Sequence, residues 1–219
     1  MNMHSVLLYG CAAVVVVLGL RLLVTLAAKG CDETPPPLAL LRTWRRPTPR
    51  AATGLVATMA MLGVAQVVVP AMINELERHP HGAWWQAVTA LMVQSSGWPQ
   101  LLFNLAALAV VAPVAERLFG PWWMLLVFAT SGVTAQAVSM AGWSLQGGGD
   151  SVAICGLVGA LATWYAVRGS VIALRRVAPL IPAAGLVLCL LTNNHGMGLL
   201  VGCALGAGLA IPARPPLAA

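Results

Sequence analysis

Charged residues are scarce in this chain. Of its 219 residues only 8% are charged and 59% are hydrophobic, and the mean hydropathy is +0.85. A soluble domain carries about 25% charged residues, so the composition excludes an ordinary soluble protein and indicates an integral membrane protein. Acidic residues are rarest, six against twelve Lys and Arg, which gives a net charge of +6. Because the basic residues gather in loops, this charge requires no nucleic acid, and we expect no such partner.

Cysteine spacings that would indicate a disulfide framework or a zinc site are also missing. The five cysteines include no CxxC and form no cluster with histidine. Four of them lie inside apolar segments, and their odd number fits buried, unreactive thiols. We therefore expect no metal and no cofactor.

Aromatic residues are few, but eight of the thirteen are tryptophan, which anchors membrane helices at the membrane–water interface. Seven apolar segments have lengths near that of a membrane helix. Their approximate ranges are 5–28, 52–72, 98–115, 121–142, 151–167, 177–192 and 195–212. The connections leave no room for a hidden soluble domain. The sequence thus predicts an all-α, polytopic membrane helix bundle, with one N-terminal transmembrane helix and a core of six.

The basic residues orient this bundle, because they fall almost entirely on one side of an alternating topology. That side holds Lys29, Arg42, Arg45, Arg46, Arg50, Arg117, Arg168, Arg175, Arg176 and Arg214. The other side holds Arg78 together with Glu75, Glu77 and Asp150. The positive-inside rule predicts an N-terminus outside and a C-terminus in the cytoplasm, for a multi-pass protein of the plasma (inner) membrane.

The same pattern divides the chain into three parts. Residues 1–50 form an N-terminal transmembrane helix and a basic, Pro-rich cytoplasmic linker, 51–213 the six-helix core, and 214–219 a short cytoplasmic tail. Basic residues follow the first apolar run, which is the reverse of a secretory signal, so we expect an anchor helix.

Two of the apolar segments carry stripes of small residues that begin at a chemically reactive side chain. Ser151, Cys155 and Gly159 recur every four residues, and His195 is followed at helical spacing by Gly198, Gly202 and Gly206. Such stripes let two membrane helices approach closely. We expect Ser151 and His195 to come within hydrogen-bond reach, the minimal apparatus of nucleophilic hydrolysis.

The sequence resembles the rhomboid family of intramembrane serine proteases. The resemblance rests on short motifs in the family's order, at 84–89 (WWQAVT), 98–104 (WPQLLFN), 116–120 (ERLFG), 149–157 (GDSVAICGL) and 195–198 (HGMG), with Gly202 and Gly206. They extend over the six-helix core. The first helix and the linker lie outside the resemblance.

The resemblance implies a role for each matching residue. Ser151 falls on the nucleophile and His195 on the general base. Asn104 falls on the residue whose amide helps to hold the oxyanion, and Gly149 on the first glycine of the serine motif. It also implies substrates that are transmembrane segments of other proteins, cleaved in the lipid bilayer.

Two departures from the family pattern bear on activity. Gln100 stands where the family has histidine, although an amide can still donate a hydrogen bond to an oxyanion. Val152 stands where the family has a second glycine, and we expect its side chain to crowd the oxyanion pocket or the substrate groove. A family histidine near Gln94 is absent as well. These departures keep open an inactive rhomboid-like protein that binds transmembrane helices, and a small transporter or channel is a weaker alternative.

The same residues also have purely structural interpretations. Ser151 alone would cap a helix, with Asp150 as the better cap or as a loop residue facing water. His195 alone would be an interfacial histidine, and Asn104 and Gln100 would be polar contacts between helices. We expect Glu116 and Arg117 to be structural, and the glycine stripe to serve packing in any case.

Overall fold

The computed structural model describes residues 2–28, 36–45, 47–80, 82–144 and 146–211. Within that part, six helices are long and apolar enough to cross a membrane, and a seventh apolar helix is shorter. These are α1 (Met3–Ala28), α3 (Arg50–Val68), α6 (Trp98–Phe119), α7 (Pro121–Val138) with its π-helical end η1 (Ser139–Trp143), α8 (Ser151–Arg168), α9 (Ile172–Val177) with α10 (Leu180–Leu190), and the shorter α11 (Asn194–Ala210). The predicted all-α polytopic bundle is confirmed.

Prolines account for two differences from the predicted segments. The second segment ends at Val68 instead of residue 72, because Pro70 has no N–H to continue the helix, and α4 (Ala71–Leu76) follows. The sixth begins at Ile172 and is interrupted before α10, where Pro179 is the N-terminal cap. Two further short helices are α2 (Pro36–Arg42), inside the predicted linker, and α5 (Gln86–Thr89). Lys29, Cys31 and the tail 214–219 lie outside the described residues.

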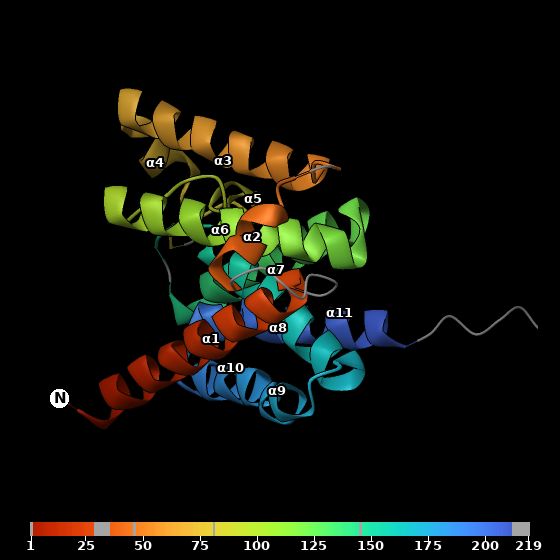
Figure 1. Cartoon of the computed structure of the whole chain (residues 1–219). Helices are drawn as coiled ribbons and strands as arrows, with labels where there is room; N and C mark the ends of the chain where they lie inside the picture. Colours follow the sequence, from red (N-terminus) through yellow and green to blue (C-terminus); the bar gives the residue numbers. More distant parts are fainter. Residues whose placement is uncertain (1, 29–35, 46, 81, 145, 212–219) are drawn as a thin grey trace, which may run out of the picture.

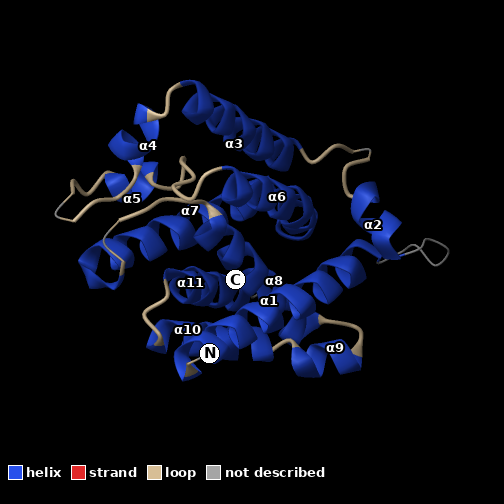
Figure 2. Cartoon of the chain, turned by 90° about the vertical axis from the view of Figure 1, so that its left-hand side faces the viewer, coloured by secondary structure: helices blue, strands red, loops and turns tan. Residues whose placement is uncertain are grey.

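Helix α8 lies in the middle of the bundle. In both ribbon views α3 and α6 lie towards one edge and α9 and α10 towards the other, with α7, α8 and α11 between them (Figure 1; Figure 2). Of the six long helices α8 is the most buried, at 61% of its apolar window, and it has the lowest hydropathy, 1.4. A helix surrounded by protein does not need a strongly lipophilic surface, which explains why glycine and alanine are common in it.

The closest helix contact joins α8 to α11, and glycine makes it possible. A Cβ atom added at Gly198, Gly202 or Gly206 would lie closer than 3.0 Å to the backbone carbonyl oxygens of α8. No side chain could be accommodated there without separating the helices. The predicted stripe on α11 is therefore a packing surface, as close approach through small residues requires.

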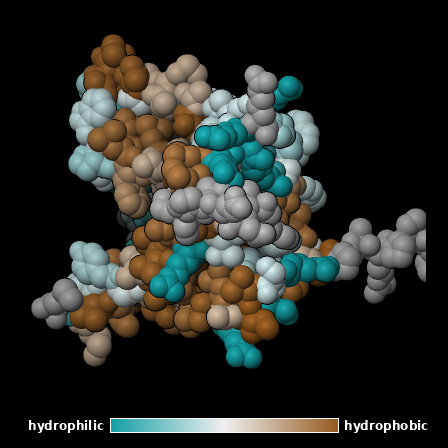
Figure 3. Space-filling view, viewed as in Figure 1, coloured by the Kyte–Doolittle hydropathy of each residue, from teal (hydrophilic) through white to brown (hydrophobic). Residues whose placement is uncertain are grey.

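The outer surface of the bundle is apolar. Figure 3 shows hydrophobic residues over much of α3 and around α1. Large side chains on these helices are well exposed, among them Met61, Val64 and Val68 on α3 and Val16 and Val17 on α1. Apolar surface of this extent is stable in hydrocarbon rather than in water. The chain is accordingly a multi-pass membrane protein.

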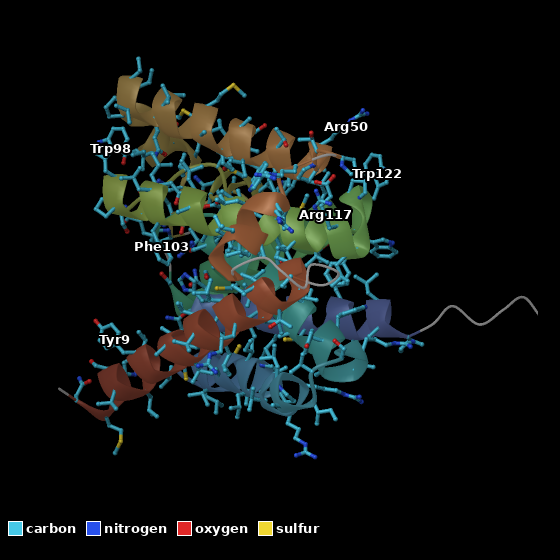
Figure 4. All side chains as sticks on the ribbon, in the orientation of Figure 1. Tyr9, Arg50, Trp98, Phe103, Arg117 and Trp122 are labelled. Carbon is cyan, nitrogen blue, oxygen red and sulfur yellow. The ribbon has the colours of Figure 1, made fainter. Side chains whose placement is uncertain are left out.

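The two ends of the bundle are distinguished by arginine, whereas tryptophan lies at both. Figure 4 shows Arg50, Arg117 and Trp122 at one end, and Trp98 and Tyr9 towards the other. Tryptophan thus marks both ends, as in an aromatic belt. Helix α6 begins at Trp98. Helix α7 runs in the opposite direction to α6, so α8 also begins on the Trp98 side, away from Arg50 and Arg117.

Glu116 and Arg117 join the core to the segment before α3. The Glu116 carboxylate accepts hydrogen bonds from the N–H groups of Ala51 (3.2 Å) and Ala52 (2.6 Å), which have no partner within α3. The Arg117 guanidinium donates to the carbonyl oxygens of Thr43, Arg45 and Pro47. Both residues are structural, as the sequence predicts, although they bind backbone groups rather than each other.

The glycine packing leads to a first prediction. Gly202→Ala should lower the thermal unfolding temperature in detergent, because the new methyl group would collide with the backbone of α8 at Gly156. Alanine otherwise favours a helix over glycine by about 1 kcal/mol. Gly208→Ala is the matched control, since no atom lies within 4 Å of the added Cβ, and it should leave the unfolding temperature unchanged or raise it. Equal unfolding temperatures for the two variants would contradict the close contact.

Candidate active site

Ser151 and His195 meet at the N-terminal ends of the two most closely packed helices. Ser151 is the first residue of α8, and His195 is the second of α11. The Ser151 Oγ lies 2.9 Å from the His195 Nε2. Both side chains are partly exposed. The glycine stripe of α11 therefore brings a hydroxyl and an imidazole into a hydrogen bond.

Asn193 fixes the orientation of the imidazole. It caps α11, and its Oδ1 lies 3.0 Å from both the backbone nitrogen and the Nδ1 of His195. An amide oxygen is only an acceptor, so the Nδ1 carries the proton and the Nε2 has a free lone pair towards Ser151. Asn193 is not among the residues predicted from the motifs, although asparagine before a helix is a common capping signal.

The loop before Ser151 is held by backbone hydrogen bonds at Gly147 and Gly149. Gly147 exchanges two hydrogen bonds of 3.1 Å with Arg78, and the Gly149 N–H donates to the carbonyl of Ala90. Gly149 has a φ of +151°, and a Cβ there would collide with the amide of Gln100. The positive φ favours glycine at position 149, and a larger residue would also have to displace the Gln100 amide. The predicted importance of Gly149 to the serine motif has this physical basis.

Gln100 and Asn104 lie one turn apart on α6, and both amides are already hydrogen-bonded. The Gln100 Nε2 donates to the Gly148 carbonyl at 3.0 Å, and its Oε1 accepts from the N–H of Ser96 at 2.7 Å. The Asn104 Nδ2 donates to the Gln94 Oε1 at 2.8 Å and to the Asp150 Oδ1 at 2.9 Å. Their oxyanion role stays a prediction, and the structure adds the acceptors with which an oxyanion would compete.

Asp150 does not face water, so that expectation is wrong. Its side chain is fully buried, and its Oδ1 accepts from the Nε2 of Gln94 at 2.7 Å as well as from Asn104. Nor does the carboxyl cap α8, because the side chain makes no capping hydrogen bond. Gln94 and Asn104 make the position polar enough to keep a carboxyl inside the protein. Sequence reasoning treated Gln94 only as a missing histidine.

A buried arginine supports the same loop from the other side. The Arg78 guanidinium, 4% exposed, donates to the backbone and hydroxyl oxygens of Ser144 and to the Oε1 of Gln136. Gln136 in turn donates from its Nε2 to the Gly149 carbonyl at 3.0 Å. Burial lowers the pKa of Arg78, and the neighbouring Glu77 opposes this shift. In the sequence Arg78 stands out only as a charge on the external side, and no local pattern predicts its support of the loop.

Val152 belongs to the core of the bundle. Its side chain is 1% exposed and packs with the buried residues of α8 and its neighbours. The expected crowding of the oxyanion pocket stays a prediction. Within the described residues, no group of three or more His, Cys, Asp and Glu side chains is arranged to hold a metal ion.

Together these features define a class of protein, a polytopic membrane protein with a serine–histidine pair at the ends of two tightly packed helices. The family comparison agrees, because the model of the rhomboid domain matches residues 81–212. The chain belongs to the rhomboid family. The matched region begins before α5 and ends after α11, so it contains the serine, the histidine and the residues around them.

Two relatives from Bacillus subtilis (strain 168) show local similarity. The protein named "Putative rhomboid protease YdcA" is 38% identical over 53 residues, which are 24% of this chain and 26% of the relative. The protein named "Rhomboid protease GluP" is 34% identical over 80 residues, 36% of this chain and 16% of the relative. The chain thus spans about a quarter or less of the relatives it matches. No solved structure matches it significantly.

The buried arginine gives a second prediction. Arg78→Ala should lower the thermal unfolding temperature, because Gln136 and Ser144 lose their charged donor and hydrogen bonds to charged groups contribute about 1.5–3 kcal/mol. Arg78→Lys should recover little, since an ammonium cannot reproduce the planar fork. Arg176→Ala is the control, because this arginine is exposed. Unfolding temperatures that do not distinguish Arg78→Ala from Arg176→Ala would refute the supporting role.

Proposed function

We propose that this rhomboid-family protein is an intramembrane serine endopeptidase that cleaves transmembrane segments of other membrane proteins. The observation that carries the proposal is the 2.9 Å hydrogen bond between the Ser151 hydroxyl and the His195 Nε2. Family membership and the position of the pair among membrane helices support it further. The proposed reaction uses only groups of the protein and water and requires no metal or cofactor.

The chemistry follows from the hydrogen bonds around the pair. His195, with its Nδ1 proton held by Asn193, accepts the Ser151 proton at Nε2 while Oγ attacks the scissile carbonyl. The tetrahedral intermediate then collapses, the peptide C–N bond breaks, and His195 gives the proton to the leaving amine. Water hydrolyses the acyl-enzyme by the same proton transfers in reverse order.

The oxyanion of the intermediate needs hydrogen-bond donors beside Ser151. The backbone N–H groups of Ser151 and Val152 open α8, where N–H groups have no partner within the helix. The amides of Gln100 and Asn104 complete the proposed set; Gln100 gives one N–H to another acceptor, and Asn104 gives both. In comparable sites one such donor contributes roughly 3–4 kcal/mol to the transition state.

The site lies on the membrane side opposite Arg50 and Arg117, and Arg78 is the basic residue beside it. We infer an orientation with Arg50 and Arg117 in the cytoplasm, the N-terminus outside and the pair near the external face of the plasma (inner) membrane. A peptide bond inside a helix is shielded by its own hydrogen bonds, so we expect substrates whose helix unwinds locally near that face. We also propose the division into residues 1–50, the core 51–213 and the tail 214–219.

A second candidate function is helix binding without cleavage, by an inactive rhomboid-like protein. Gln100 and Val152 favour it, since both depart from the family motifs, and so does the engagement of Asn104 by Asp150. A fluorophosphonate probe separates the two functions. It should label Ser151 only where His195 activates the hydroxyl, whereas an inactive protein would bind helices and stay unlabelled.

The proposed reaction is tested by removing each member of the pair. Ser151→Ala and His195→Ala should each abolish cleavage of a model transmembrane substrate in liposomes, and probe labelling with it, because neither residue can replace the other. Ser170→Ala and His4→Ala are matched controls in exposed positions and should cleave like the wild type. Persistent cleavage by Ser151→Ala would refute the proposal, and so would a wild type that neither cleaves nor labels.

Asn193 offers a separate test of the histidine's orientation. Asn193→Ala should lower kcat by about tenfold or more with a smaller change in KM, because the imidazole loses the acceptor that fixes its tautomer. Asn193→Asp keeps an acceptor oxygen in place and should restore most of the rate. Asn194→Ala, one residue further along, is the control. If Asn193→Ala and Asn194→Ala had equal kcat, orientation by Asn193 would be wrong.

A further inference from the structure

We propose that Asp150 is a positioning residue whose carboxyl group competes with the reaction's oxyanion for the amide of Asn104. The inference rests on the proposed protease function and deepens it, because it concerns how the oxyanion donors are controlled. It assigns a role to the residue between Gly149 and Ser151.

The Asn104 amide has no N–H group to spare. A side-chain amide nitrogen carries two hydrogens and donates two hydrogen bonds. Asn104 gives one to the Gln94 Oε1 at 2.8 Å and the other to the Asp150 Oδ1 at 2.9 Å. Its donor capacity is therefore filled in this structure. An oxyanion receives a hydrogen bond from Asn104 only when one of these two acceptors gives it up.

The Asp150 carboxyl sets the direction in which the neighbouring amides point. The Asp150 Oδ1 also accepts from the Gln94 Nε2 at 2.7 Å, so Asp150, Gln94 and Asn104 form a closed triangle. Because an oxygen that accepts two hydrogen bonds needs nitrogens facing it, this triangle fixes which way both amides are turned. All three side chains are at most 3% exposed. Asp150 therefore determines where the Asn104 hydrogens point.

Gln100 is controlled differently. Its Nε2 makes one hydrogen bond, to the Gly148 carbonyl, which leaves its second N–H without an acceptor in the described part of the chain. The two proposed side-chain donors are thus unequal at rest. Gln100 can meet an oxyanion without breaking a bond, whereas Asn104 must first leave Asp150 or Gln94.

The Asp150 side chain is separable from the start of α8. The backbone carbonyl of Asp150 accepts from the N–H groups of Ala153 and Ile154, which begin the helix. Its carboxyl makes no capping hydrogen bond, and no described residue donates to the Oδ2. Truncation of the side chain should therefore change the Asn104 amide while the helix and the Ser151 backbone keep their hydrogen bonds.

The test is a double-mutant cycle on the full chain in liposomes. Asp150→Ala should raise kcat for a model transmembrane substrate by about tenfold, less than the 10²- to 10³-fold that a whole oxyanion donor contributes. Asn104→Ala should reduce kcat by a larger factor in the Asp150→Ala background than in the wild type. Asp150→Asn, which keeps the shape and weakens the acceptor, should give an intermediate rate and serves if the alanine variant does not fold.

A stability cycle on the same variants reports the contact without relying on activity. The decreases in unfolding temperature for Asp150→Ala and Asn104→Ala should not add, because the two share a hydrogen bond. A slower Asp150→Ala enzyme, or a rate gain that persists without Asn104, would overturn the inference. If the wild type cleaves the substrate, additive decreases in the unfolding temperatures of the two variants would overturn it as well. Coupled stability without cleavage or labelling by any variant would reject the proposed function together with the role of Asp150.

Discussion

The contact between α8 and α11 determines the geometry of the candidate site. Side chains normally keep helix axes 8–10 Å apart, but the backbones meet here because Gly198, Gly202 and Gly206 present no Cβ to the carbonyl oxygens of α8. In hydrocarbon there is little hydrophobic force between helices, so such van der Waals contact is a main source of their association. The same contact sets the separation of the first turns, where Ser151 and His195 are found. Packing and chemistry thus share one constraint.

A second constraint acts on the loop between η1 and α8. This loop turns through glycines with positive φ at 147 and 149, which by themselves would leave it free to adopt many conformations. The surrounding polar groups come from three separate parts of the chain: Arg78 in the loop after α4, Gln100 on α6 and Gln136 on α7. Each binds a different backbone group. A glycine-containing loop that is hydrogen-bonded at several points can keep a nucleophile in place, although its glycines alone would leave it flexible.

Periodicity and composition were sufficient for the fold, since seven apolar segments and two small-residue stripes correspond to the observed helices and to their closest contact. They were insufficient for the polar interior. The Asp150 carboxyl pairs with Gln94 and Asn104, which lie 56 and 46 positions away, and no local pattern reports such a separation. Arg78 and Gln136 escaped notice for the same reason. Asn193 was the exception, because its relation to His195 is local and helix capping could have revealed it.

The resting hydrogen bonds of the Gln100 and Asn104 amides illustrate a general difficulty for the proposed active site within a membrane. Donors must be ready for an oxyanion, yet a buried N–H without an acceptor destabilises the protein by about 1–3 kcal/mol. A resting acceptor removes that penalty, but it also reduces the net gain when the oxyanion forms, because one hydrogen bond is exchanged for another. Catalysis then depends on the difference between the two acceptors. Gly148 offers Gln100 a neutral carbonyl and leaves one N–H spare, whereas Asp150 offers Asn104 a carboxyl oxygen. The stronger the resting acceptor, the less its donor contributes to the transition state, so in the proposed reaction we expect Gln100 to contribute more to oxyanion binding than Asn104.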